Sequence, residues 1–127
     1  MSDPTFQAVD SVRLLHNLGG NQVLMRKLAD AFEQSLPAWL EDLHSALQNH
    51  SPDRFSKAAH KIKGALATLS ADHASRLAQS LEEMGKTGGL ANAPTGVANL
   101  ASELIRVRES LRTIIAEFAK TDLNAES

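Results

Sequence analysis

Residues 93–118 read APTGVANLASELIRVRESLRTIIAEF, and their apolar side chains recur at alternating steps of three and four. The recurring positions are Val97, Leu100, Leu104, Val107, Leu111, Ile114 and Phe118. This spacing places them along one face of a long α-helix. A single apolar stripe of this kind is typical of a helix that packs lengthwise against others in a bundle.

The same helical spacing continues toward the N-terminus. We predict helices over about 10–18, 21–48, 51–70, 70–85 and 92–121, joined by short connections. Short connections make successive helices antiparallel neighbours. The sequence therefore predicts an all-α protein, an antiparallel four-helix bundle with a short additional N-terminal helix. We expect one domain over residues 1–127, with its core between about 10 and 121.

Several residues predict where these helices begin and end. Asp10, Asn21 and Ser51 are suitable N-caps, because their side-chain oxygens can accept from free backbone N–H groups. We expect Ser70 to end the third helix and cap the fourth. Gly85 is expected to stop the fourth helix, with residues 85–92 forming a loop.

Two features concern the longest helices. Pro37 interrupts the apolar pattern of the second helix, where we expect a kink rather than a break. After about Thr121 the chain is polar, and we expect it to be frayed.

Composition excludes several classes of function. The 127 residues contain no cysteine, which excludes disulfides and thiolate metal sites. Lys and Arg number 13 against 15 Asp and Glu, so nothing suggests a nucleic-acid partner. No apolar run approaches the roughly 18 residues of a membrane span, and the acidic N-terminus is unlike a signal peptide. We expect a cytoplasmic protein without membrane contact, and a monomer, because no second apolar stripe is left for a partner.

The third predicted helix carries a polar stripe opposite its apolar face. Its members are Asp53, Ser56, Lys57, His60, Lys63, Gly64 and Ala67. Spacings of three and four place His60 in the middle, between Lys57 and Lys63, with Gly64 beside it. A neutral imidazole is a competent nucleophile at neutral pH, and nearby lysines favour an anion such as a phosphoryl group.

Periodicity alone leaves simpler readings open. A histidine on an exposed helix face is usually an ordinary surface residue. Glycine within a helix costs about 1 kcal/mol relative to alanine. Gly64 therefore indicates either close packing against another helix or clearance for an approaching surface.

The segment Ala59-His60-Lys61-Ile62-Lys63-Gly64 resembles the signature of the histidine-containing phosphotransfer (HPt) family. Residues 14–21 (LLHNLGGN) resemble its first helix and the Gly-Gly start of its long helix. Phe32, Pro37, the run from Leu43 to Leu47, and the pair Leu81-Glu82 resemble other family positions. The resemblance covers about residues 10 to 118.

The resemblance implies a phosphoryl carrier in a multistep relay, without kinase activity or a cofactor of its own. By position, His60 would accept the phosphoryl group, Lys63 would hold its oxygens, and Gly64 would leave room for the partner. The partners would be receiver domains of response regulators or hybrid sensor kinases, whose own acidic pocket would hold magnesium. Ala67 and Ser70 stand where the family often has glycine.

Further residues are candidates for orienting the imidazole or for docking. Lys57 and Ala67 lie on the same stripe, and the returning fourth helix should bring Gln79, Glu82 or Glu83 alongside His60. Solvated helix surface is an equally good reading for each of these three. An apolar rim around His60 could include Val12, Leu15, Gln22 and Met25.

Three other interpretations remain. Trp39 is either a docking residue or a residue at the edge of the core. The bundle could bind receiver domains without accepting phosphate. It could also bind a metal, since Glu41 and His44 have the Glu-x-x-His spacing of di-iron bundles, although no second such motif exists.

Overall fold

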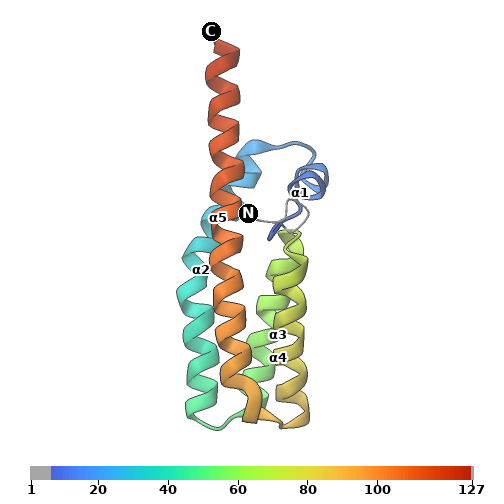
Figure 1. Ribbon diagram of the computed structural model, residues 1–127, viewed down its shortest axis with the longest axis vertical. Helices are drawn as coiled ribbons and strands as arrows, with labels where there is room; N and C mark the ends of the chain where they lie inside the picture. The colour runs from blue at the N-terminus through green and yellow to red at the C-terminus, as the bar shows by residue number, and fades with distance from the viewer. Residues whose placement is uncertain (1–6, 127) are drawn as a thin grey trace.

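The computed structural model describes residues 7–126, in which all regular secondary structure is helical. The helices are α1 (Ser11–Asn17), α2 (Gln22–Gln48), α3 (Pro52–Thr68), α4 (Asp72–Thr87) and α5 (Ala93–Glu126), with a 3₁₀ turn, η1, at Leu90–Asn92. Four of them lie side by side and alternate in direction, while α1 sits at one end of the bundle (Figure 1). The predicted four-helix bundle with a short N-terminal helix is confirmed.

The predicted N-caps explain where three helices begin. The side chain of Asp10 accepts a hydrogen bond from the Arg13 N–H, and that of Asn21 accepts from the Leu24 N–H. Ser51 accepts from the Arg54 N–H. Each bond satisfies one of the backbone donors that a helix N-terminus leaves without a partner.

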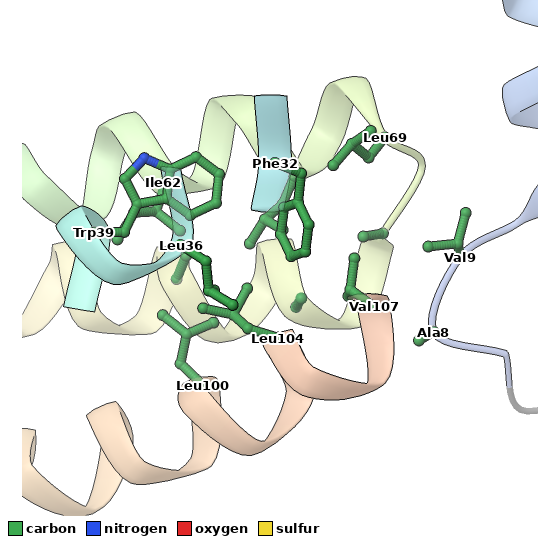
Figure 2. Close-up of a cluster of buried hydrophobic side chains, with 14 of the residues drawn as sticks. Ala8, Val9, Phe32, Leu36, Trp39, Ile62, Leu69, Leu100, Leu104 and Val107 are labelled. Carbon is green, nitrogen blue, oxygen red and sulfur yellow. The ribbon is translucent and has the colours of Figure 1, made fainter. Parts of the chain in front are cut away.

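The core lies where α2, α3, α4 and α5 face one another. Phe55, Ile62, Leu66, Leu100 and Leu104 are completely buried. Figure 2 shows Phe32, Leu36 and Trp39 of α2 facing side chains of α3 and α5, with Ala8 and Val9 at the end of the bundle. The apolar stripe of residues 97–118 therefore forms the predicted seam.

Two predicted helix ends were wrong. Helix α4 continues past Gly85 to Thr87, because Gly88 adopts the left-handed conformation (φ 76°) that ends it. The predicted loop 85–92 therefore consists of the last turn of α4, two glycines and η1. Helix α5 continues to Glu126 instead of fraying after Thr121, because neither Gly nor Pro follows Phe118.

The turn between α3 and α4 also differs from the prediction. Ser70 does not cap α4, whose N-cap is Ala71 without a side-chain hydrogen bond. Ser70 instead adopts a left-handed conformation (φ 56°), and the Ala71 N–H donates to the Leu66 carbonyl. This is the Schellman geometry that glycine usually provides. The Ser70 hydroxyl accepts from Arg13 Nε at 3.3 Å and so helps hold α1 against the turn.

Helix α2 runs through Pro37 as one 27-residue element. Pro37 therefore does not break α2 within the described residues. The kink at Pro37 stays a prediction.

Candidate phosphotransfer site

His60 lies on the solvent-exposed face of α3. Residues Phe55, Ala59 and Ile62 of the same helix are completely buried, and they fix the rotation of α3 against the core. The His60 side chain retains 67% of its accessible surface. The stripe predicted around it is exposed at Lys57, Gly64 and Ala67. Ser56, predicted on the same stripe, is buried instead because α4 covers it.

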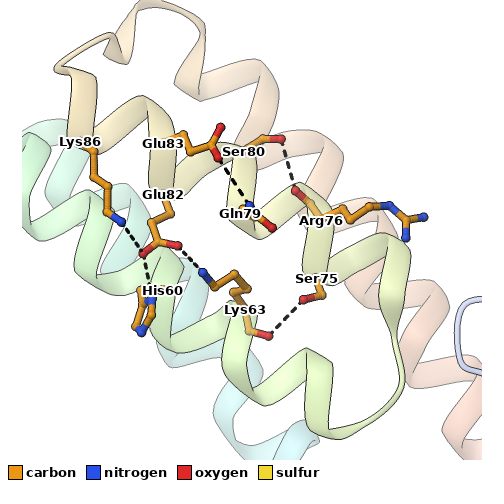
Figure 3. A network of polar contacts seen from close by, with 9 residues as sticks. All are labelled: His60, Lys63, Ser75, Arg76, Gln79, Ser80, Glu82, Glu83 and Lys86. Atoms are coloured by element: carbon orange, nitrogen blue, oxygen red, sulfur yellow. Dashed lines mark hydrogen bonds and ion pairs between the residues drawn. The ribbon is translucent and has the colours of Figure 1, made fainter.

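Glu82 of α4 joins the polar residues of the site. Its carboxylate is almost fully buried, with 6% of the side chain exposed. One oxygen, Oε2, lies 2.7 Å from His60 Nδ1 and 3.3 Å from Lys86 Nζ, and the other, Oε1, accepts from Lys63 Nζ at 2.6 Å. Figure 3 shows these three side chains converging on the carboxylate.

The surrounding donors keep Glu82 ionised. The hydrogen bond from Lys63 is the main cause of a pKa lowered from 4.5 to about 2, and the bonds to His60 and Lys86 act in the same direction against the cost of burial. An ionised carboxylate can only accept hydrogen bonds. The proton in the His60–Glu82 contact therefore belongs to Nδ1, which donates to Oε2.

This tautomer determines which ring nitrogen is reactive. When Nδ1 of a neutral imidazole carries the proton, Nε2 holds a free lone pair. Nε2 lies on the side of the ring away from Glu82 (Figure 3). The site thus presents an unprotonated nitrogen outward, on a ring held from behind by a buried carboxylate.

The charges of the site favour an incoming anion. One carboxylate, Glu82, lies among two lysine ammonium groups, which leaves a formal charge of +1 with a neutral imidazole. The ammonium of Lys63 has three N–H donors, and its contact with Glu82 uses one of them. Donors therefore remain for the oxygens of a group bound near Nε2.

Gly64 faces open space beside His60. A Cβ built on Gly64 would meet no atom within 4 Å. Close packing against another helix, one of the two readings of this glycine, is therefore excluded. Clearance for an external surface is the reading that agrees with the geometry.

Two other predicted candidates have different partners. Lys57 forms an exposed ion pair with Asp53, at 3.0 Å. Gln79 Nε2 donates to Glu83 Oε1 at 3.5 Å, within α4. Of the three residues proposed to contact the imidazole from α4, Glu82 is the one that the structure places against it.

Lys86 is the site residue that sequence reasoning missed. It lies four residues after Glu82 on the same helix, a spacing at which opposite charges pair. That signal was available once Glu82 was a candidate. Its relation to His60, however, depends on the packing of α4 against α3.

The apolar surface near the N-terminus differs in part from the predicted rim. Val12 is 78% exposed, but Met25 is completely buried in the core. Val23 and Leu24, which immediately precede Met25 on α2, are exposed instead. Trp39 is buried and packs edge-on against Phe32 with ring centroids 5.7 Å apart, which supports the core-edge reading.

Among residues 7–120, no three His, Asp or Glu side chains gather closely enough to hold a metal ion. None of the described helices is long and apolar enough to cross a membrane.

Comparison with known proteins identifies the family. The family model of the Hpt domain matches residues 27–110, more than half of the chain. The crystal structure of histidine-containing phosphotransfer protein B from Pseudomonas aeruginosa PAO1 is similar, with 27% identity and a TM-score of 0.76 over 91% of this chain and 98% of that one. The search of curated proteins found no significant match. The described bundle and the family match together show that the chain belongs to the Hpt domain family.

Proposed function

We propose that this chain carries phosphoryl groups on His60 in a multistep phosphorelay. The supporting observation is the pairing of an exposed imidazole with a buried, ionised Glu82, which leaves Nε2 unprotonated and facing outward. The donor is the aspartyl phosphate of a receiver domain, and the acceptor is the aspartate of another receiver. These receivers belong to response regulators or hybrid sensor kinases. We expect a cytoplasmic monomer that acts as a carrier and has no kinase activity of its own.

The chemistry requires one bond to form and one to break. The Nε2 lone pair attacks phosphorus, the P–O bond to the receiver aspartate breaks, and the aspartate leaves as a carboxylate with the electron pair. The imidazole ring keeps its Nδ1 proton and becomes positively charged. Glu82, 2.7 Å from Nδ1, stabilises that charge.

The remaining site residues have supporting roles in this proposal. Lys63 donates to the phosphoryl oxygens with the N–H groups that Glu82 does not use. Gly64 and Ala67 give the receiver room to approach along the exposed face of α3. Magnesium belongs to the acidic pocket of the receiver.

The test is transfer of radiolabel from a phosphorylated receiver, with magnesium, onto wild type, His60→Gln and His44→Gln. His44 is a matched control, because it is also exposed within a long helix. We expect acid-labile, base-stable label on wild type and His44→Gln only, with all three proteins equally helical by circular dichroism. Label on His60→Gln would show that another residue accepts the phosphoryl group.

The same experiment addresses the alternative that the bundle binds receivers without chemistry. In that case wild type would bind a receiver in a calorimetric titration but take no label from any receiver tested. That result would replace the carrier proposal with the interaction module.

A further inference from the structure

Helices α3 and α4 come into backbone contact at Gly85. A Cβ built on Gly85 would lie 2.7 Å from both Cβ and the backbone N of Ser56, and 2.8 Å from the Pro52 carbonyl oxygen. Carbon atoms in van der Waals contact are about 3.5–4.0 Å apart. Two of the three neighbouring atoms are backbone and have no rotamer by which to move away. Only glycine fits between the helices at this separation.

This contact lies one turn from the His60–Glu82 pair. Ser56 precedes His60 by four residues on α3, and Gly85 follows Glu82 by three residues on α4. Because the helices are antiparallel, the backbone contact and the polar pair are neighbours along the same interface. Both Ser56 and Gly85 are buried there, beneath the exposed stripe.

We propose that Gly85 is a positioning residue, which sets the separation of α3 and α4 at which Glu82 reaches the His60 ring. The inference rests on the proposed function of His60. A side chain at position 85 would require the helices to separate by about 1 Å. A comparable displacement of Glu82 would lengthen the 2.7 Å contact to about 3.7 Å, which is no longer a hydrogen bond.

The loss of this contact has a specific consequence for the ring. Without Glu82 as acceptor, the proton is free to occupy either nitrogen, and the fraction of rings with a bare Nε2 falls. The carboxylate also moves away from the charge that develops on the ring. Gly85 therefore controls the reactivity of His60 without touching it.

The chain provides a matched control in Gly96. A Cβ there would also be crowded, at 2.6 Å from Leu81 Cδ2, but that neighbour is the end of a flexible side chain, and the contact lies between α4 and α5. Gly96→Ala should cost stability while leaving the α3–α4 separation unchanged. It therefore separates a general packing defect from a displaced Glu82.

The experiment compares wild type, Gly85→Ala and Gly96→Ala by nitrogen-15 NMR of the histidine rings, followed by phosphotransfer. In wild type we expect His60 to hold its proton on Nδ1. In Gly85→Ala we expect shifts toward a mixture of tautomers and transfer slowed about tenfold or more. In Gly96→Ala we expect wild-type His60 signals and a wild-type rate. A folded Gly85→Ala protein with wild-type ring signals would overturn the proposal.

A second variant keeps the proposal testable if Gly85→Ala does not fold. Ser56→Val adds bulk from the opposite side of the same contact, and unchanged His60 signals in that variant would also overturn the proposal. The ring measurement needs no phosphoryl donor. A wild type that takes no label would therefore contradict the proposed function, while the NMR result would still decide the role of Gly85.

Discussion

Replacing Glu82 by glutamine keeps the shape of the buried side chain and removes its charge. In the wild type this carboxylate has three cationic or potentially cationic partners within 3.3 Å. The amide keeps one accepting oxygen, replaces the other with an NH2 donor, and leaves the lysines without a counter-charge. The substitution therefore tests whether the buried charge stabilises both the fold and the reactive ring.

The effect on stability follows from the pKa of Glu82. The lowering from 4.5 to about 2 corresponds to an upper bound of about 3 kcal/mol at neutral pH. His60 and Lys86 are largely exposed, so water screens part of this, and we expect about 1–2 kcal/mol.

The pH dependence has a definite sign. Because the folded-state pKa is depressed, this stabilisation is complete above the unfolded value of 4.5 and is lost as pH falls toward about 2. Urea unfolding at pH 7 should show Glu82→Gln to be less stable than wild type. At pH 3 the difference should shrink by about half or more.

The effect on transfer follows from the charge that the ring acquires. A full charge pair about 4 Å apart is worth about 1–4 kcal/mol between water and a protein surface. Bond formation is only partial in a loose transition state, so about half of that energy is realised, and the rate falls about tenfold. Rapid-quench transfer from a phosphorylated receiver measures this rate. If Glu82→Gln matches wild type in both transfer rate and stability at pH 7, the assigned role of Glu82 is wrong.

Two further predictions concern backbone conformation. Gly64→Ala should raise stability by about 1 kcal/mol in urea unfolding, because alanine favours helix and the new methyl meets no atom within 4 Å. The same methyl should obstruct the receiver and slow transfer. An unchanged transfer rate would show that Gly64 is not needed to leave room for the receiver. Ser70→Gly should raise stability by about 0.5 kcal/mol in urea unfolding, since relief of the left-handed strain outweighs the lost hydrogen bond to Arg13. A loss of stability would show that the hydrogen bond to Arg13 contributes more than the strain costs.

The fold was predictable because its signals are local and repeated. Three-four spacing identifies each helix, and Asp10, Asn21 and Ser51 identify three of their starts. The errors occurred where one residue type serves two purposes. Gly85 looked like a helix stop but is a packing glycine, and Ser70 looked like an N-cap but takes the left-handed position of a C-terminal turn. Local sequence does not distinguish these uses, because the difference lies in what the neighbouring helix places there.

The site residues also differ in how far local sequence predicts their proximity. His60, Lys63 and Gly64 share one helix, so their proximity follows from helical geometry alone. The contact with Glu82 depends on the register between α3 and α4, and counting residues from the turn at Ser70 left Gln79, Glu82 and Glu83 as candidates. Each residue turns a helix by about 100°, so rotation of α4 decides which of them faces His60. That rotation is fixed by buried residues such as Ala78, Leu81 and Gly85, which lie against the other helices. The packing that determines stability thus also determines which carboxylate orients the imidazole.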